Sequence, residues 1–396
     1  MVSLLQNGLM NRILFLCEPN FQMNREIAHG MAAALDKQGP FVLRGRTPQG
    51  RTDRLCTFLK SFNPVGVVIS WGVPPVILSY IERESIPCVA LHDAMVGAPP
   101  MPIMRVNYAA TGRMAAEHLI SKGFKHFGFV GYGYSPAHRD CFDAFAAALR
   151  KKNHDCHDFL TNLPIGSLDA DRNYHPPHSL AAWLKKLPRP CAVMGFNDAI
   201  AGVIVDLCLA EGLRVPGELA VLGADNNLEI CQFSSPDISS ICQPYRAIGA
   251  AAVELLLAHP KGRPQKREVR EFEPTDIAER GSTRAMWTED SAVERTLEFI
   301  RRNITRPFRI GELRLHAALS SAQLAVRFQA ALGRTPIMEV RAQRIALARQ
   351  LLRDTDLSAG EIAQQCCFNS AVHFCHTFKE LCGVSPLQFR RKTRST

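Results

Sequence analysis

Short, almost continuous runs of apolar residues recur through the first 280 residues of the chain. Six of them have the length and hydrophobicity of strands buried on both faces: residues 12–17, 65–70, 88–91, 127–131, 192–196 and 219–223. Between them, apolar residues at three- and four-residue spacing predict helices over residues 25–35, 112–121, 144–151 and 199–211. This alternation predicts an α/β fold of parallel sheets with right-handed crossovers. The number of units favours two lobes, whose ligands would bind at the carboxyl ends of strands.

A polar segment separates this α/β part from the rest of the chain. A charged loop around Pro260 and Pro264 precedes one last predicted strand over residues 268–272. Residues 281–291 are then polar and, apart from Trp287, short of large apolar side chains, which is typical of a linker. We therefore expect an α/β domain over residues 11–280, a linker over residues 281–291 and a second domain over residues 292–396.

The second domain has helical periodicity only. Seven short helices are expected, near residues 292–303, 310–315, 321–332, 336–353, 359–366, 371–381 and 386–392. A pattern also repeats with an offset of 50 residues: Ser320, Leu324, Phe328, Gly333 and Pro336 recur as Ser370, Phe374, Phe378, Gly383 and Pro386. Each copy predicts a helix, a tight turn, and a second helix that begins at a capping serine and ends before a glycine. The doubled unit predicts two helix-turn-helix motifs in an all-α domain, joined by a helix of about 18 residues.

Charge separates the two parts of the chain further. The whole protein carries 47 Lys and Arg against 37 Asp and Glu, and residues 281–396 hold 18 basic against 10 acidic residues. This concentrated positive charge predicts that the helical domain binds double-stranded DNA. The 13 scattered cysteines, an odd number, favour reduced thiols over a disulfide framework. No apolar run approaches the roughly 20 residues that cross a bilayer, and we recognise no export signal, so we expect a cytoplasmic protein without membrane contact.

Residues 292–396 resemble the AraC/XylS-type DNA-binding domain over its full length. The strongest stretch runs from Gly333-x-Thr335-Pro336 through Arg344-Ile345-x-x-Ala348-x-x-Leu351-Leu352 to Phe389-Arg390. Three positions depart from the pattern: Arg314 replaces an alanine, and Ala318 and Cys367 replace the turn glycines.

Residues 12–280 resemble the periplasmic-binding-protein-like effector domain of LacI/GalR-type repressors. The clearest motifs are Asn197-Asp198-x-x-Ala201, Gly212-x-x-Val215-Pro216, the run from Leu219 to Asn226, and the closing Glu279-Arg280-x-Ser282-Thr283. An effector domain followed by an AraC-type domain resembles the XylR type of transcriptional regulator. The resemblance implies one lobe of about residues 11–122 and 242–260, a second of about 123–241 and 266–280, and a small sugar such as D-xylose between them. It also implies a homodimer, contact with RNA polymerase, and activation of carbohydrate-use genes.

Polar residues at strand ends are the first candidates for the sugar site. Asp225 follows a predicted strand, where its carboxylate can accept two hydrogen bonds from neighbouring sugar hydroxyls, with a turn or helix cap as the alternative. Asp198 also follows a strand and is expected either to cap the next helix or to contact the ligand. Arg25, near the start of the first crossover helix, can donate a bidentate pair to a sugar or remain a solvated arginine.

Three further residues complete the ligand candidates. Asn107 stands where the repressor pattern has an aspartate, which removes a charge but keeps polar reach. Cys141 occupies the place of an arginine in the pattern, and Arg139 is the candidate substitute. Trp71 follows the second predicted strand and is expected either to stack on a pyranose ring or to pack in the core.

DNA contacts are expected from the exposed face of the second helix in each repeat. In the first copy these residues are Ala322, Gln323, Ala325, Val326 and Arg327, and in the second they are Asn369, Ala371, Val372, Cys375, His376 and Lys379. Few of them carry polar groups that read bases. An alternative is that the first copy contacts only phosphates and the shape of the DNA, with charge from Arg327, Arg334, Arg341 and Lys379.

The sequence disfavours two other classes of function. An enzyme is disfavoured because the chain has no nucleophile elbow, phosphate loop or metal-ligand helix. A solute-binding protein with a basic tail is disfavoured by the doubled helix-turn-helix. The cysteines and histidines of residues 366–382 lack a CxxC pair and fall on different helix faces, so we expect no metal and no cofactor.

Overall fold

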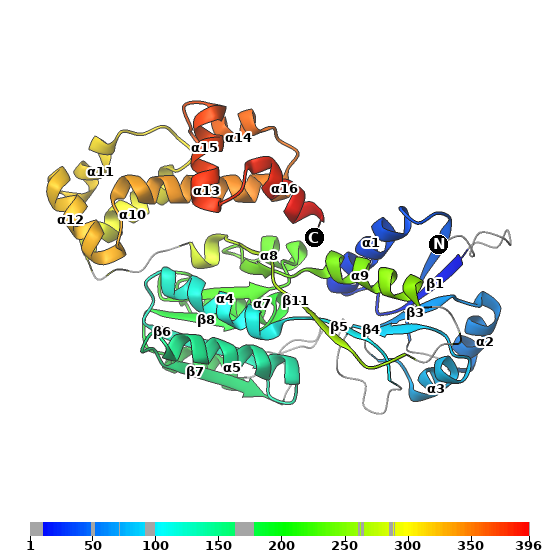
Figure 1. Ribbon diagram of the computed structural model, residues 1–396. Helices are drawn as coiled ribbons and strands as arrows, with labels where there is room; N and C mark the ends of the chain where they lie inside the picture. Colours follow the sequence, from blue (N-terminus) through cyan, green and yellow to red (C-terminus); the bar gives the residue numbers. More distant parts are fainter. Residues whose placement is uncertain are drawn as a thin grey trace. The chain divides into compact units, whose positions relative to one another are not determined.

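The computed structural model describes residues 11–48, 52–70, 72–91, 100–162, 178–259, 262, 265–284, 288 and 290–395 (Figure 1). The chain divides into two compact units. The first contains residues 1–107 and 243–274, and the second contains residues 108–242 and 275–394. The polypeptide therefore passes between the units at residues 107/108, 242/243 and 274/275.

The first unit is built on a parallel sheet with the strand order β11-β5-β4-β3-β1-β2. Its strands are β1 (Asn11–Leu16), β2 (Phe41–Arg46), β3 (Gly66–Ile69), β4 (Cys88–Ala90), β5 (Ile103–Val106) and β11 (Val269–Phe272). Its helices are α1 (Gln22–Leu35), α2 (Thr52–Phe62), α3 (Pro75–Arg83) and α9 (Tyr245–Ala258). Every residue of β3 and β4 is buried, which confirms the prediction of central strands covered on both faces.

The second unit begins with a similar α/β body. Its sheet has the order β12-β10-β9-β8-β6-β7, parallel except where β12 runs antiparallel to β10. The strands are β6 (His126–Tyr132), β7 (Cys156–Thr161), β8 (Cys191–Gly195), β9 (Leu219–Ala224), β10 (Ser239–Cys242) and β12 (Asp276–Ala278). The helices are α4 (Tyr108–Ser121), α5 (Pro136–Arg150), α6 (His178–Lys186), α7 (Asp198–Ala210) and α8 (Leu228–Phe233). Apolar side chains of α4 and α5 form one core cluster with this sheet, and those of α6 and α7 form another.

The basic part of the second unit is helical, as predicted; we call it the reader domain. Its helices are α10 (Ser291–Asn303), α11 (Ile310–Ala317), α12 (Ser321–Leu332), α13 (Pro336–Asp354), α14 (Ala359–Gln365), α15 (Ala371–Cys382) and α16 (Pro386–Ser395). One core cluster surrounds Leu324 and Phe328 of α12, and a separate one surrounds Phe374 and Phe378 of α15. The 19-residue α13 contributes Val340 to the first cluster and Ile345 to the second, so this helix joins the two repeats (Figure 1).

The predicted helix ends of the repeats are confirmed. The Ser320 hydroxyl accepts a hydrogen bond from the Gln323 N–H at 3.2 Å, and the Ser370 hydroxyl accepts one from the His373 N–H at 3.1 Å. Helices α12 and α15 end at Gly333 and Gly383, whose φ angles of 67° and 73° are left-handed.

The structure corrects several expected boundaries. Helix α4 packs closely on α5 and lies in the second unit, so the first crossing falls at residues 107/108 and not near residue 122. Strand β11 pairs with β5, which places residues 269–272 in the first unit. The turn Gly281–Thr283 buries Ser282 and Thr283 completely, so the predicted linker begins inside the folded body.

Five strands escaped the sequence prediction, namely β2, β5, β7, β10 and β12. Strands β2 and β7 lie at sheet edges and expose polar residues, so they lack the continuous apolar run that marks a central strand. The other three are only three or four residues long and contain Arg, Ser or Asp.

Both helix-turn-helix turns place a residue other than glycine in left-handed backbone, since φ is 56° at Ala318 and 55° at Cys367. We expect Cys367→Gly to raise the free energy of unfolding by about 1 kcal/mol, because glycine relieves the clash of Cβ with the backbone at positive φ. Thermal unfolding measures the change. Ala330→Gly, in an exposed helical position of α12, is the control and is expected to cost about 1 kcal/mol. A lower melting temperature for Cys367→Gly would contradict this account.

Candidate functional site

The best-formed candidate site of the second unit lies at the carboxyl end of β9. This strand ends at Ala224, and the next two residues have left-handed backbone, with φ of 102° at Asp225 and 52° at Asn226. The Asp225 N–H donates to the Ile241 carbonyl at 2.9 Å, and the Asn226 N–H donates to the Ser240 hydroxyl at 2.8 Å. The prediction that Asp225 follows a strand end is confirmed. Its half-buried carboxylate lies on a loop tied to the neighbouring strand β10.

The buried side chain of Asp198 holds this loop by a hydrogen bond to its backbone. Its side chain is only 1% exposed, and Oδ2 accepts a hydrogen bond from the Asn227 N–H at 2.6 Å. The predicted capping role is wrong, because the Asn197 side chain accepts from the Ile200 N–H at 3.0 Å and is itself the N-cap of α7. Burial raises the pKa of the Asp198 carboxyl well above its usual range, and hydrogen bonds from Ser240 and the Asn227 N–H partly oppose this. Direct contact of Asp198 with a ligand stays a prediction.

Arg280 is a further residue of this site, and its only sequence signal is its place in the Glu279-Arg280-x-Ser282-Thr283 motif. Its side chain is 1% exposed and donates to the Ile238 carbonyl at 2.9 Å and to the Asn226 side-chain oxygen at 2.6 Å. Ser239 holds the Arg280 backbone from both sides, because its hydroxyl accepts from the Arg280 N–H and donates to the Arg280 carbonyl. Arg280 thus fixes the residue next to Asp225 from a position 54 residues later in the chain.

Aromatic side chains gather at the same edge of the sheet, where the parallel strands β6 and β8 end. The His138 ring stacks on Phe196 with centroids 3.4 Å apart, and Tyr108 lies 5.5 Å from Phe196. His138 Nδ1 accepts a hydrogen bond from the Tyr132 N–H at 2.9 Å. Aromatic faces next to a carboxylate suit a sugar, which has both hydroxyls and an apolar ring face. No local sequence pattern marks His138 as a site residue.

Arg139, the candidate substitute for the missing arginine, lies two residues before Cys141 in α5. Cys141, at that position, is fully buried in the core between α4 and α5. The exposed Arg139 lies in the first turn of α5, and its Nε donates to the Gly133 carbonyl in the preceding loop. Its contact with a ligand remains a prediction.

Burial lowers the pKa of His138 to about 3, so the folded protein holds this ring neutral. Because the unfolded chain binds the proton near pH 6.5, stability is lost as the pH falls from about 6.5 towards 3. We expect this group alone to cost about 2 kcal/mol of unfolding free energy between pH 7 and pH 5. Urea unfolding at the two pH values should show a smaller loss for His138→Asn than for wild type. The exposed His376→Asn serves as the control, and a loss in His138→Asn as large as in wild type would contradict the assignment.

The first unit contains the other predicted ligand residues. Arg25, in α1, donates to the Asn20 carbonyl at 2.9 Å, and the Asn107 amide donates to Glu273 at 2.9 Å. Trp71 lies outside the described residues. The structure adds Asn24, which is buried and links two strand ends by donating to the Glu18 carbonyl and accepting from the Ser70 hydroxyl. These contacts place Arg25 and Asn24 just beyond the carboxyl end of β1.

The predicted DNA-contacting residues mostly lie on exposed helix faces. The exposed ones are Ala322, Gln323, Val326, Arg327, Asn369, Ala371, Val372, His376 and Lys379, whereas Ala325 and Cys375 are half-buried. Val326 and Val372 are 69% and 80% exposed, although they are apolar. Such side chains can contact thymine methyl groups. The exposed faces of α12 and α15 are therefore the candidate DNA-contacting surface.

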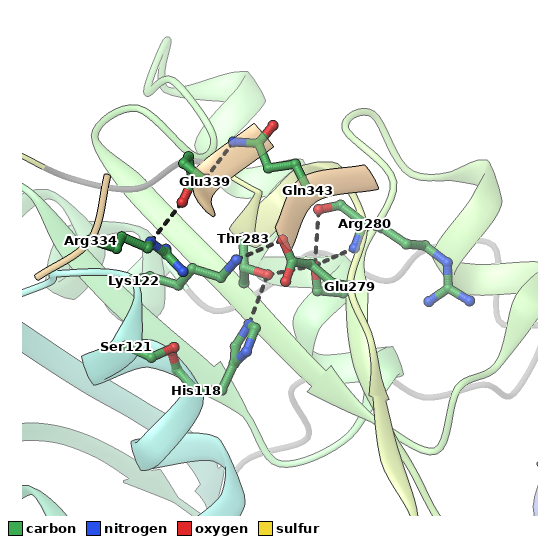
Figure 2. A network of polar contacts seen from close by, with 10 residues as sticks. His118, Ser121, Lys122, Glu279, Arg280, Thr283, Arg334, Glu339 and Gln343 are labelled. Carbon is green, nitrogen blue, oxygen red and sulfur yellow. Dashed lines mark hydrogen bonds and ion pairs between the residues drawn. The ribbon is translucent and has the colours of Figure 1, made fainter. Parts of the chain in front are cut away.

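Polar groups of the first repeat already have partners within the protein. The Gln323 side-chain oxygen accepts from the Ser320 N–H at 3.1 Å, and Arg327 pairs with Asp290 at 3.3 Å. Arg334 pairs with the buried Glu339 at 2.7 Å, and Glu339 also accepts from Gln343, as Figure 2 shows. Two of the arginines expected to contact phosphates, Arg327 and Arg334, are thus engaged within the protein, as is the Gln323 oxygen. Whether the first repeat reads bases or only grips phosphates stays a prediction.

The residues that the structure describes include no helix that is both long and apolar enough to span a membrane. All thirteen cysteines lie in this described part and are free thiols.

Two family models match the chain: a periplasmic binding protein-like domain over residues 116–283 and a helix-turn-helix domain over residues 315–392. The xylose operon regulatory protein of Haemophilus influenzae is 27% identical over 335 residues, which cover 82% of this chain and 84% of that protein. The protein of the same name from Escherichia coli K12 is 28% identical over 298 residues, 74% of each chain. The HTH-type transcriptional repressor PurR of Aliivibrio fischeri (strain MJ11) is 36% identical over 268 residues, 63% of this chain and 74% of the repressor.

Solved structures share the fold. That of the xylose-binding transcription activator xylR covers 97% of this chain and 99% of its own, with a TM-score of 0.58 at 24% identity. That of a LacI family transcriptional regulator from Enterococcus faecium with bound ribose covers 70% of this chain and 100% of its own, with a TM-score of 0.53 at 18% identity.

Proposed function

We propose, from the premise that this chain belongs to the XylR-type transcriptional regulators, that a small sugar bound by its α/β domain controls how its reader domain acts at promoters. Members of this type join a periplasmic-binding-protein-like domain to an AraC-type helix-turn-helix domain. D-xylose is the proposed effector, since two curated relatives are named for the xylose operon.

The observation that carries the sugar-binding proposal is the Asp225 loop. Its left-handed backbone is held by three buried groups, namely Asp198, Ser240 and Arg280, so the carboxylate is oriented before a ligand arrives. A carboxylate can accept hydrogen bonds from two adjacent hydroxyls of a sugar. The aromatic cluster around His138 and Phe196, at the ends of neighbouring strands, would supply the apolar contact.

In the first unit we propose Arg25 and Asn107 as further sugar contacts, and in the second unit Arg139 and Asp198. Arg25 donates to the Asn20 carbonyl and Asn107 to Glu273, and a guanidinium and an amide are both donor groups that suit sugar hydroxyls. Asp198 contributes chiefly by holding the loop that carries Asp225.

For DNA, we propose that α15 reads bases and that α12 grips the backbone. Asn369 and His376 can recognise donor and acceptor patterns in the major groove, while Val372 and Ala371 meet thymine methyl groups. Lys379 and the arginines of the reader domain would contact phosphates. We further propose a cytoplasmic homodimer that pairs through the α/β domain and activates transcription by contacting RNA polymerase, without catalytic activity of its own.

Two measurements on the purified full-length protein test this proposal. In the first, a panel of pentoses and hexoses is screened for a rise in melting temperature. A ligand present at 100 times its Kd should stabilise the folded protein by about 2.7 kcal/mol and so raise its melting temperature. Binding to promoter DNA is measured at about 50 and 200 mM salt, where six or more phosphate contacts predict an affinity loss of about a thousandfold. If no sugar moves the melting temperature, the effector proposal fails. A flat salt response would contradict the DNA proposal.

A further inference from the structure

One ion-pair cluster joins the α/β body of the second unit to its reader domain. Asp276 is the first residue of β12 and the second residue after the crossing at residues 274/275. Its Oδ2 accepts a hydrogen bond from Arg353 Nη1 at 2.7 Å, and its Oδ1 accepts one from Arg349. Both arginines belong to α13. The contact is shielded from water, since the side chains of Asp276 and Arg353 are 9% and 8% exposed.

The charges around this cluster make Asp276 the counterion of both arginines. Arg349 and Arg353 are one helical turn apart, and burial together with the charge on Arg353 lowers the pKa of Arg349. Glu279, on the same small cavity of about 230 Å³, is already paired with Lys122 at 2.6 Å. Burial and the charge on Lys122 lower the pKa of His118 to about 4, so that ring stays neutral near pH 7; it lies 3.1 Å from the Thr283 hydroxyl (Figure 2). Among the described residues, Asp276 is the ion-pair partner of Arg349 and Arg353.

The cluster holds the one helix that carries both repeats. Helix α13 packs Val340 into the core of the first helix-turn-helix motif, and Ile345, Ala348 and Leu352 into the core of the second. A change in the position of Asp276 would therefore move both recognition helices together and would leave the distance between them unchanged.

The same cluster is connected to the proposed sugar site through two paired strands. Strand β12 pairs with β10, with Asp276 opposite Cys242 and Ala278 opposite Ser240. The Ser240 hydroxyl accepts from the Asn226 N–H, next to Asp225. Asp276 thus lies one strand away from the Asp225 loop and directly contacts the reader domain. Coupling between sites needs such a contiguous set of contacts with an element that both sites can bias.

We propose that the Asp276–Arg349–Arg353 cluster is the latch that transmits occupancy of the sugar site to the reader domain. This inference rests on the proposed function, because the signal that the latch passes on is sugar binding. With the latch intact, the bound and free states of the α/β domain set the orientation of α13. Without Asp276, two like charges remain together and the reader domain is released from this contact.

The test compares Asp276→Asn with wild type in the full-length chain. Wild type is expected to change its affinity for promoter DNA at least about tenfold when saturated with sugar, a usual range for coupled sites. In Asp276→Asn this ratio should fall below about twofold, while the sugar still raises the melting temperature. Asp276→Glu keeps the charge and should keep most of the response. Glu312→Gln, which removes an exposed ion pair with Arg306 inside the reader domain, is the matched control and should leave the ratio unchanged.

Two further readouts make the result decisive. Introduced alone, Arg353→Gln should reduce the change in DNA affinity that sugar causes. Added to Asp276→Asn, it should cause no further reduction, since both substitutions remove the same contact. Trypsin cleavage after Arg284 should be at least about fivefold faster in Asp276→Asn even without sugar, because release of the reader domain makes the half-buried Arg284 more accessible. A full sugar response in a folded Asp276→Asn, or unchanged cleavage, would overturn the latch. A wild-type chain whose melting temperature no sugar changes would instead contradict the proposed function, and the cleavage assay would still decide whether the latch exists.

Discussion

Asp225→Ala is expected to abolish the sugar-induced rise in melting temperature and to weaken sugar affinity at least about 100-fold. The variant loses two hydrogen bonds from sugar hydroxyls to a charged acceptor, each worth about 1.5–3 kcal/mol. Isothermal titration calorimetry with the sugar found in the panel measures the loss. Binding to promoter DNA in the absence of sugar should remain, because the reader domain has its own two cores.

The left-handed backbone at Asp225 requires a second variant. Alanine is strained at a φ of 102°, whereas asparagine tolerates positive φ and keeps the shape of the side chain without the charge. Asp225→Asn should therefore fold like wild type and still lose about tenfold or more in sugar affinity. Asp158→Ala, which removes an exposed carboxylate on β7, is the control. Unchanged sugar affinity in Asp225→Asn would remove this residue from the site.

Gly112→Ala is expected to destabilise the second unit by about 3 kcal/mol or more. A Cβ at this position would lie 2.1 Å from the Cys141 carbonyl oxygen and 2.9 Å from the Phe145 nitrogen. Both contacts are to the backbone of α5, so the whole helix would have to move away from α4. Urea unfolding, followed by tryptophan fluorescence and circular dichroism, measures the loss.

Gly311→Ala is the matched control for this prediction. It also adds one methyl group to a helical glycine, but nothing lies within 4 Å of the new Cβ. We expect it to be neutral or to stabilise the reader domain by up to about 1 kcal/mol, because alanine is the better helix former. Equal stability of Gly112→Ala and wild type would show that the two helices can separate at little cost.

The helices of the reader domain could be predicted almost to the residue. Their amphipathic spacing, their capping serines and the glycines at their ends all point to the same boundaries, and all of these signals are local. The central strands were equally clear because both faces are buried. Edge strands such as β2 and β7 have one face in water. Polar residues interrupt their apolar runs, so the continuous hydrophobic pattern of a central strand is missing.

The candidate sugar site could be predicted only in part. Asp225 was found because a carboxylate after a buried strand is a local pattern. The roles of Asp198 and Arg280 depend on partners 29 and 54 residues away, and no local pattern reveals such a pairing. His138 was missed because an isolated histidine at a helix start carries no signal of its own. Its stacking on Phe196 appears only once β6 and β8 lie side by side.

The order in which the strands occur along the chain has a consequence for synthesis on the ribosome. The sheet of the first unit includes β11, which follows β5 by more than 160 residues, and α9 comes only after the sheet strands β6 to β10 of the second unit. The first unit therefore cannot complete its sheet until residue 272 has left the exit tunnel, although its first strand emerged much earlier. At about 5–20 residues per second, the nascent chain carries an open sheet edge at β5 for roughly 10–30 s. During this interval we expect the unpaired edge of β5 to be open to pairing with other chains.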